Sequence, residues 1–462
     1  MTETSNLTLS ELAALCDEPQ ERLRRWQDRG LLPAAGDDLV PVEACERVRL
    51  IRYALEQGLS EDELARVNAE QNDLLGNFTG MLGSPRTKAL SFEDAAAISG
   101  TDPELMDRIW RAAGLHDQRV AYEDDLEALR WMNAAMALGL PETVMLQMVR
   151  VFASSLGRVA DSAVRLFHMH VHEQLRADGL RGAELIAATQ ASADPLAELI
   201  EPAVLYFHRK AWERAFRDDL ILHLREDSRP ISDVPGELER AVLFADLASF
   251  TPLTEAMGDA AAAQVLERFA TLVHDAAAEC GGEVVKQIGD ALMLVFADAT
   301  SAVRCGLAID ERASNEPMFP AVRLGAHHGT ALYREGDYIG ATVNLAARIA
   351  ASADRHQFLT TTAVRDQTSL PDVVFDPLGP HTLKGVAESV ELFAAHKLAG
   401  PTMRPTDPVC GMELNPAIAA ARLQWQGHDL VFCSTDCVQR FLENPDRYQP
   451  AGSLGPGPDE HV

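Results

Sequence analysis

The sequence predicts a multidomain protein with three parts: an all-α N-terminal region, a central domain with buried strands, and a small C-terminal module that carries clustered cysteines. Up to about residue 227 the chain is rich in Ala, Leu, Glu and Arg, with apolar residues at the helical spacings of three and four. Beyond residue 240, apolar runs such as VVKQIGDALMLVF (284–296) are typical of buried strands. Three of the seven cysteines, Cys410, Cys433 and Cys437, fall together near the end.

The helical region contains an internal repeat, with one copy in residues 1–70 and a second in 71–227. Each copy begins with a short helix, a turn and a second helix that ends at a Gly-Leu pair, and a longer pair of helices follows. In this alignment Gly30-Leu31 corresponds to Gly114-Leu115. A last helix at 205–227 carries an apolar stripe and precedes a breaker-rich linker at 228–239. Two interpretations of the stripe remain open: ordinary core, or a surface that passes a regulatory change into the next domain.

Composition excludes several classes of function. The formal charge of −29 argues against general binding to nucleic acid or to anionic membranes, because both surfaces would repel it. No apolar run approaches the ~20 residues that span a bilayer, and the N-terminus lacks a signal-peptide pattern. We therefore expect a cytoplasmic protein with no membrane partner and a disordered tail at 451–462.

Two aspartates occupy matched settings. Asp246 in FADLASFTPLTE and Asp290 in VVKQIGDALMLVF each adjoin an apolar run that predicts a buried strand. The pattern therefore predicts two carboxylates side by side at a strand end. Carboxylate oxygens suit Mg²⁺ or Mn²⁺, and two such ions can clamp the attacking and leaving oxygens of a phosphoryl displacement.

The segment from 240 to 398 resembles the catalytic domain of class III nucleotidyl cyclases, which convert a nucleoside triphosphate to its 3′,5′-cyclic monophosphate. The resemblance rests on five motifs in the family's order: FADLASFTPL, GGEVVKQIGDALMLVF, VRLGAHHGTA, GDYIGATVNLAARI and HTLKGVAESVELF. It implies an α+β fold of the ferredoxin-like βαββαβ type. It also implies two Mg²⁺ or Mn²⁺ ions per site, held by Asp246 and Asp290.

The resemblance further assigns roles to five residues. Lys286 and Asp337 correspond to the positions that select the base, and a Lys donor with an Asp acceptor suits adenine, so ATP is the expected substrate. Asn344 would orient the ribose, Arg348 would stabilise charge on the pentavalent phosphorus, and Lys384 would contact the terminal phosphates. No Walker A pattern is present, so a P-loop is excluded.

The family builds each site from two subunits. The metal aspartates of one subunit face the base-reading and transition-state residues of another. Because this chain holds one copy of each set, the resemblance implies an adenylate cyclase (EC 4.6.1.1) that acts as a homodimer.

The first repeat also resembles the helix-turn-helix of MerR-type regulators, with Leu23-Arg24 and Gly30-Leu31 in the family's positions. An alternative function is therefore a DNA-binding regulator with a cyclase-like nucleotide-binding module. Residues 1–67 hold eight arginines and no lysine against fourteen acidic residues, which is the wrong balance for a DNA reader. A regulatory or protein-interaction role is favoured.

Three histidines lie in LFHMHVHEQL (166–175), on a predicted helix. His168 and His172 share a face and His170 points elsewhere, so one helix cannot offer all three to a metal. They are either exposed helix histidines or a pH-responsive switch, since histidine changes charge near neutrality. The region resembles, less closely than the catalytic segment, helical regulatory domains of actinobacterial class III cyclases, some of which respond to pH.

The C-terminal segment 404–450 resembles the YHS domain, a small metal-associated module, through DPVCGM and FCSTDC. Cys433 and Cys437 are predicted to share a helix face, with Cys410 brought in from a preceding turn. Three thiolates suit Zn²⁺ or Cu⁺, and His428 is a candidate fourth ligand. The alternative is that the cysteines form the core of a small module.

Overall fold

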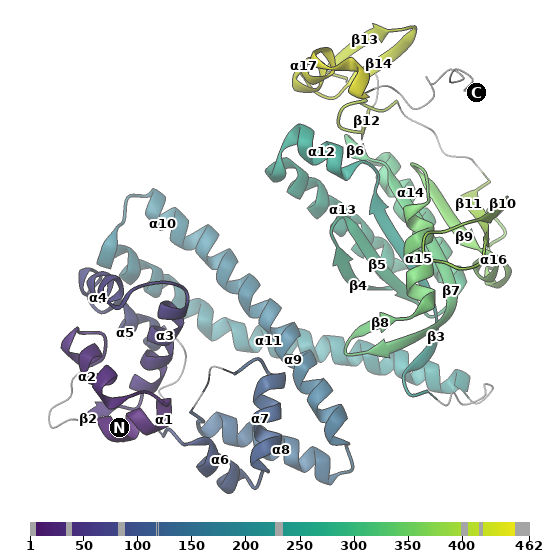
Figure 1. Ribbon diagram of the computed structural model, residues 1–462. Coiled ribbons are helices and arrows are strands. Elements are labelled where there is room, and N and C mark those ends of the chain that lie inside the picture. Colours follow the sequence, from purple (N-terminus) through teal and green to yellow (C-terminus); the bar gives the residue numbers. More distant parts are fainter. Residues whose placement is uncertain are drawn as a thin grey trace, which may run out of the picture. The chain divides into compact units, whose positions relative to one another are not determined.

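The computed structural model describes residues 6–33, 39–81, 88–116, 118, 120–226, 234–398, 405–414 and 419–448. The chain divides into two compact units, Met1–Ile231 and Ser232–Val462 (Figure 1). Within the described residues, no helix is both long and apolar enough to cross a membrane. The predicted disordered tail at 451–462 lies outside the described residues.

The first copy of the repeat is helical, with two short strands added. Its elements are β1 (Asn6–Thr8), α1 (Leu9–Cys16), α2 (Gln20–Asp28), β2 (Leu39–Pro41), α3 (Ala44–Glu56) and α4 (Glu61–Glu70), and the short helix α5 (Leu74–Met81) follows beyond its predicted end at residue 70. The strands β1 and β2 pair antiparallel and form a small two-stranded ribbon, which the prediction of an all-α region did not include. Thr8 with Glu11 forms a capping box that starts α1, and Ser60 with Glu63 forms the one that starts α4.

The second copy repeats this plan. Its elements are α6 (Phe92–Ser99), α7 (Pro103–Ala112), α8 (Glu123–Ala137) and α9 (Glu142–Phe167). The aligned stops Gly30 and Gly114 have φ of 70° and 74°. In both copies the next amide closes a Schellman bond, from Leu31 N to the carbonyl of Trp26 and from Leu115 N to that of Trp110. The similarity of the two copies is therefore local as well as topological.

Long helices end the N-terminal unit. A π-helical turn (His168–His172) joins α9 to α10 (Glu173–Ala177), and α11 (Gly182–Glu226) follows. The predicted helix at 205–227 is thus the last part of a longer one, and residue 227 lies outside the described residues. Its apolar stripe is exposed, with Trp212 at 62% and Phe216 at 63%. Within the described part of the N-terminal unit, the side chains of this stripe are therefore not part of the core.

The C-terminal unit contains a mixed sheet of the predicted α+β type. The sheet order is β10-β11-β9-β7-β3-β5-β4, and β8 pairs with β7. The strands are β3 (Glu237–Leu247), β4 (Glu283–Ile288), β5 (Ala291–Phe296), β7 (Val322–Arg334), β8 (Asp337–Ile339), β9 (Gln357–Thr361), β10 (Val373–His381) and β11 (Val390–Lys397). The order β7-β3-β5-β4, all antiparallel, is the ferredoxin-like arrangement.

Helices cover both faces of this sheet (Figure 1). They are α12 (Phe250–Met257), α13 (Asp259–Glu279), α14 (Ala299–Asn315), α15 (Ala341–Ala351) and α16 (Thr362–Gln367). On β3, Leu243 and Ala245 belong to the core under α13 and α14, whereas Val242 and Phe244 belong to the core under α15. By the period of two, Asp246 lies on the α15 face.

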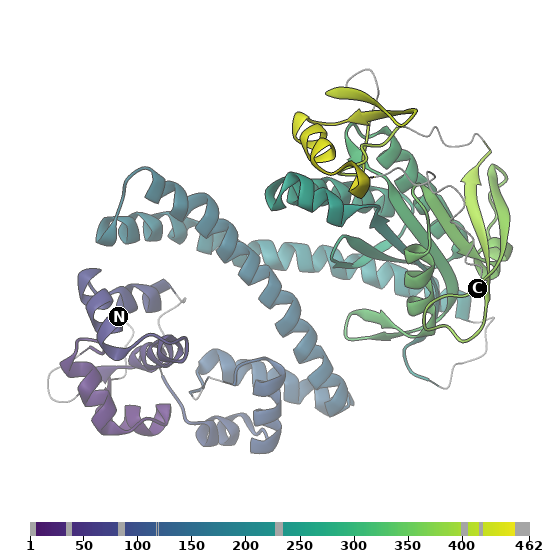
Figure 2. The same ribbon diagram turned by 45° about the horizontal axis from the view of Figure 1, so that its top comes forward.

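The cysteine-bearing module packs on the same unit (Figure 2). It contains β12 (Met412–Glu413), β13 (Ala421–Trp425), β14 (His428–Phe432), α17 (Thr435–Glu443) and a 3₁₀ turn (Pro445–Tyr448). The strand β12 pairs with β6 (Phe319–Pro320) of the central domain. Buried Val409, Met412 and Phe319 belong to one apolar cluster, so the module shares a core with the domain before it.

Candidate active site

The two predicted metal aspartates lie next to each other. Asp246, at the end of β3, is in register with Ala291 of β5, and Asp290 directly precedes Ala291 in the turn from β4. Gly289 opens this two-residue turn with a φ of 65°, a conformation that glycine adopts without strain. The strand pairing therefore brings together two carboxylates that are 44 residues apart in the sequence.

The electrostatics of Asp246 reflect this crowding. Burial raises the pKa of the Asp246 carboxyl, the charge of Arg323 acts against that increase, and the negative charge of Asp290 adds to it. Only 14% of the Asp246 side chain is exposed. A carboxylate pair of this kind gains from a cation, and its hard oxygen donors fit Mg²⁺ or Mn²⁺.

Arg323 was not singled out by sequence reasoning. It lies on β7 opposite Asp246, and its guanidinium forms a hydrogen-bonded ion pair with the Asp246 carboxylate. The motif VRLGAHHGTA marked the family but gave no role to this arginine. The signal that identifies it is the antiparallel register between β3 and β7, which cannot be read from the sequence.

The two predicted base-selecting residues also meet. Lys286 on β4 and Asp337 at the start of β8 form an ion pair across 51 positions of sequence. A bulge lies between Val284 and Lys286, and the amide of Tyr338 donates to the second Asp337 oxygen at 2.8 Å. Both side chains are 35% exposed, so a ligand can reach the donor and the acceptor.

The predicted transition-state residues lie on an exposed surface. Asn344 and Arg348 share the outer face of α15, whose buried face packs on the sheet through Val343 and Ala346. Lys384 is also exposed, in the turn after β10. Within the described residues, no hydrogen bond or ion pair joins these three side chains to Asp246 or Asp290.

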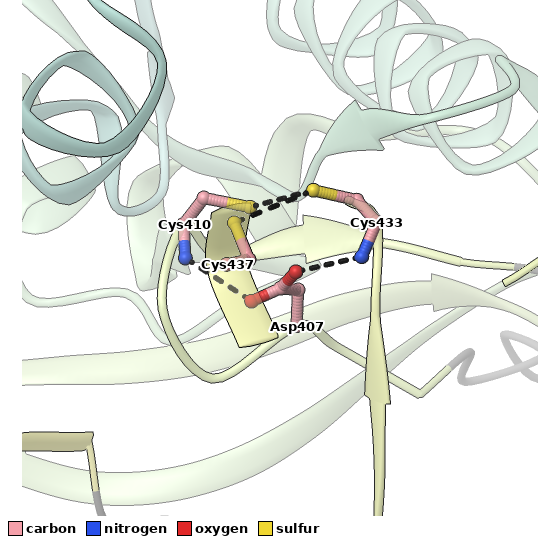
Figure 3. Close-up of side chains that lie close together, drawn as sticks. All are labelled: Asp407, Cys410, Cys433 and Cys437. Atoms are coloured by element: carbon pink, nitrogen blue, oxygen red, sulfur yellow. Dashed lines mark hydrogen bonds between the residues drawn. The ribbon is translucent and has the colours of Figure 1, made fainter. Parts of the chain in front are cut away.

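The C-terminal cysteines converge as predicted, and an acidic residue joins them (Figure 3). The Sγ atom of Cys433 lies 3.5 Å from that of Cys410 and 3.6 Å from that of Cys437. The ligand atoms of Asp407 and the three cysteines all lie within 4.8 Å of one another. Hydrogen bonds from Cys410 and Cys433 lower the pKa of Cys437, which favours a thiolate there.

Two details of the predicted cysteine site are wrong. Cys433 lies in the bend between β14 and α17, not on a helix face with Cys437, because Ser434 caps the helix. His428 is exposed at the start of β14 and is not in the cluster. The fully buried carboxylate of Asp407 is there instead, and it accepts hydrogen bonds from the amides of Val409 and Cys433. Three sulfurs with one oxygen fit a four-coordinate Zn²⁺.

The histidines of the N-terminal unit are arranged as the sequence predicts. The rings of His168 and His172 stack with centroids 4.7 Å apart, in the π-helical turn. His168 Nε2 lies 3.4 Å from Glu173 Oε1, and His172 Nδ1 lies 3.1 Å from Thr189 Oγ1. The pair therefore joins the turn to α10 and α11.

Two arginines in and directly after α2, the helix that resembles a DNA-reading helix, form ion pairs with another helix of the same unit. Arg25 of α2 and Arg29, the residue directly after this helix, both pair with Glu61 at the start of α4, at 3.1 and 2.9 Å. Their charge is thus offset by an acidic neighbour. The arrangement does not favour the DNA-binding alternative.

Three family models match successive parts of the chain. An adenylate cyclase regulatory domain matches residues 37–206, an adenylate and guanylate cyclase catalytic domain matches residues 237–397, and a YHS domain matches residues 406–451. The three matches correspond to the helical unit, the mixed sheet and the cysteine module.

Two of the relatives that this chain matches are named adenylate cyclases. A protein of Mycobacterium tuberculosis named pH-sensitive adenylate cyclase is 28% identical over 82% of this chain and 94% of its own length. An adenylate cyclase of Streptomyces coelicolor is 29% identical over 59% of this chain and 70% of its own length. Among solved structures, the adenylyl cyclase CyaB of P. aeruginosa is 22% identical and matches 36% of this chain and 96% of its own, with a TM-score of 0.31. This chain therefore carries a class III cyclase catalytic domain, between an adenylate cyclase regulatory domain and a C-terminal YHS domain.

Proposed function

We propose that this cyclase uses ATP and forms 3′,5′-cyclic AMP and pyrophosphate. The observation that carries the proposal is the pairing of Lys286 with Asp337 in the same domain as the carboxylate pair. A lysine can donate to N1 of adenine and an aspartate can accept from its N6 amino group. Guanine presents the reverse pattern at these atoms, so this pair favours adenine.

The reaction forms a bond between the ribose 3′-oxygen and the α-phosphorus. The bond from that phosphorus to the bridging oxygen breaks, pyrophosphate leaves, and the 3′-hydroxyl proton passes to solvent. Asp246 and Asp290 would hold two Mg²⁺ or Mn²⁺ ions, which when bound activate the 3′-hydroxyl and stabilise the leaving group. Arg348 would offset the charge on the phosphorus while Asn344 orients the ribose. Arg323 and Lys384 supply positive charge for the phosphates.

We infer that each site needs two copies of this chain. Asn344 and Arg348 are exposed on the outer face of α15, and no hydrogen bond or ion pair in the described part of the chain links them to the carboxylates. A second copy that places its α15 against the first copy's Asp246 and Asp290 would complete the constellation. A homodimer would then hold two equivalent sites.

The direct test is a cyclase assay with Mn²⁺ and either ATP or GTP, on the full chain and on Asp246→Asn. We expect cyclic AMP from the full chain and at least a hundredfold loss of kcat in the variant, on the order of 3 kcal/mol for one lost metal contact. Preference for GTP would contradict the base assignment. Equal activity of Asp246→Asn would contradict the metal assignment.

For the N-terminal unit, we propose regulation by pH through His168 and His172. One relative is named pH-sensitive, and the two rings stack at 4.7 Å in the turn between α9 and α10. The groups that face the pair are Glu173, which Arg176 also approaches, and Thr189. Protonation of both rings would place like charges in contact and favour a different turn geometry.

For the C-terminal module, we propose a site for Zn²⁺, or for Cu⁺ if the three sulfurs alone bind. The cluster of Asp407, Cys410, Cys433 and Cys437 supports this proposal, because its donors converge and are mostly buried. Metal analysis of the full chain against Cys410→Ser and Cys437→Ser tests it. Equal metal content in all three proteins would indicate that the cysteines are only core.

A further inference from the structure

The cysteine module contacts the loop that follows Asp246. Beyond Asp246 the chain completes β3 at Leu247, bonds through the Ala248 amide to the Ala321 carbonyl at 2.8 Å, and enters α12 through Ser249. Ser249 has a φ of 68°, which is costly for a residue with a side chain. The surroundings must therefore hold this loop in place.

Arg355 joins the loop to the module. Its Nη1 donates to Ser249 Oγ at 3.2 Å and its Nη2 donates to the Gly411 carbonyl at 2.8 Å. Glu413 of β12 lies 3.8 Å from the same Nη2 and 2.9 Å from Nε2 of His356. One guanidinium thus connects the entry to α12 with the residue directly after Cys410.

The backbone of Gly411 itself also lies against the loop, at Ser249. A Cβ at this position would lie 2.7 Å from the Ser249 Cβ, which is closer than real Cβ atoms come. The φ of Gly411 is 76°, so glycine is needed here for conformation and for space. The backbone of the module is therefore packed directly against Ser249.

The turn that presents Gly411 also carries two of the four members of the cysteine cluster, Asp407 and Cys410 (Figure 3). The Gly411 amide donates to the Asp407 carbonyl at 2.9 Å, and the Asp407 carboxylate accepts from the amides of Val409 and Cys410 at 2.8 and 3.3 Å. A second Asp407 oxygen accepts from the Cys433 amide at 2.7 Å. Any change in how the cluster is ligated must therefore act on the turn that supports Ser249.

We propose that the turn 407–411 is a positioning element for the metal-binding loop 246–249, and that Zn²⁺ in the cysteine cluster tightens the binding of the catalytic divalent cation. The proposal rests on the proposed functions of Asp246 and of the cysteine cluster. Zn²⁺ would fix the turn, the turn would fix Ser249 through Gly411 and Arg355, and Asp246 would be held closer to its metal-binding position. The cysteine module is then a metal-responsive part of the cyclase.

The first test compares Gly411→Ala with Gly427→Ala in the full chain. Both glycines have a positive φ, 76° and 82°, so the backbone strain is matched, but a Cβ at Gly427 would meet nothing within 4 Å. We expect Gly411→Ala to raise the Mn²⁺ concentration for half-maximal activity by about fivefold or more, and Gly427→Ala to leave it unchanged. Ser249→Ala, which removes only the hydroxyl, should act in the same direction as Gly411→Ala. Equal behaviour of the two glycine variants would overturn the proposal.

The second test measures hydrogen exchange, which does not depend on turnover. One equivalent of Zn²⁺ should slow amide exchange in residues 246–253 of the full chain, and Cys410→Ser with Cys437→Ser should abolish that change. If Zn²⁺ binds the cluster and exchange in 246–253 stays the same, the coupling does not exist. Slower exchange in a chain that forms no cyclic nucleotide would support the coupling and overturn the proposed cyclase function instead.

Discussion

Arg323 of β7 and Asp246 of β3 occupy paired positions on neighbouring strands, and the guanidinium of the first forms an ion pair with the carboxylate of the second. The charge of Asp290 also acts on the Asp246 carboxylate, so this carboxylate lies between one positive and one negative neighbour. A positive side chain here offsets the two carboxylates before a cation binds. We infer that it also contacts a phosphate of the proposed ATP substrate.

Arg323→Ala should lower kcat/KM for ATP by about tenfold or more, the cost of losing one hydrogen bond to a charged group. Arg323→Lys should recover part of that loss because it keeps the charge. Arg268→Ala is the control, since Arg268 pairs with Glu316 in an exposed part of the same domain. Steady-state kinetics at saturating Mn²⁺ gives the comparison. Unchanged kinetics in Arg323→Ala would show that the arginine has only a structural role and does not act on the substrate.

Base selection should follow the Lys286 and Asp337 pair. Replacing Lys286 by Glu and Asp337 by Cys together reverses the donor and acceptor pattern, and should lower the ATP to GTP ratio of kcat/KM by about tenfold or more. The double variant is preferable because either single change leaves a charged partner from the ion pair unmatched. An unchanged ratio would count against the assignment of these two residues.

Complementation tests the split site. Asp246→Ala and Arg348→Ala should each be nearly inactive, and their mixture should regain up to about a quarter of the wild-type activity, because half of the dimers are mixed and each mixed dimer has one intact site of two. Specific activity of the wild-type protein should also fall on dilution. A mixture of Asp246→Ala with Asp290→Ala is the control, since both changes fall in the same half-site. Recovery in that control would contradict the arrangement.

The sequence was sufficient for residues whose position follows from local pattern. Asp246 and Asp290 each adjoin an apolar run, and the glycine at 289 marks a tight turn, so their meeting at a strand end could be predicted. The Gly-Leu stops at Gly30 and Gly114 likewise lie at helix ends, with φ of 70° and 74°.

Long-range pairing could not be predicted in the same way. Arg323 is identified only by the register of β3 with β7, and β6 with β12 are two-residue strands too short to show a period. The spacing of Cys433 and Cys437 fits one helix face as well as it fits a bend followed by a helix, and the second is what forms. Asp407 replaces His428 because burial and amide donors, neither visible in the sequence, hold its carboxylate beside the thiols.

The stacked histidines give a pH prediction for the N-terminal unit. His168→Ala with His172→Ala should flatten the activity profile between about pH 5.5 and 8, because the charge change near neutrality is removed. His170→Ala is the matched control from the same turn, since His170 is exposed and outside the stacked pair. Activity measured across this range at fixed Mn²⁺ makes the comparison. If the pH profile of activity keeps its shape in the double variant, groups other than His168 and His172 cause the pH response.

A second pH prediction concerns His356, and it applies to the stability of the fold and not to activity. Burial would lower the pKa of His356, but the carboxylates of Asp310 and Glu413 outweigh it and raise that pKa to about 9. Because the folded-state pKa lies above the ordinary 6.5, the stabilisation is fully present below about pH 6.5 and is lost as the pH rises through about 9. Its size is on the order of 3 kcal/mol.

His356→Gln should therefore reduce the difference in melting temperature between pH 6 and pH 9.5 that the wild-type protein shows. The control is His396→Gln, whose imidazole pairs with Asp376 at an exposed position, where an ion pair contributes little. Because Glu413 belongs to β12, loss of the His356 charge removes an interaction between the central domain and the cysteine module. Exchange in residues 405–414 should accordingly rise at pH 9.5 in the wild-type protein, and at both pH values in the variant. An identical pH dependence of melting in His356→Gln and the wild type would show that this histidine does not hold the module.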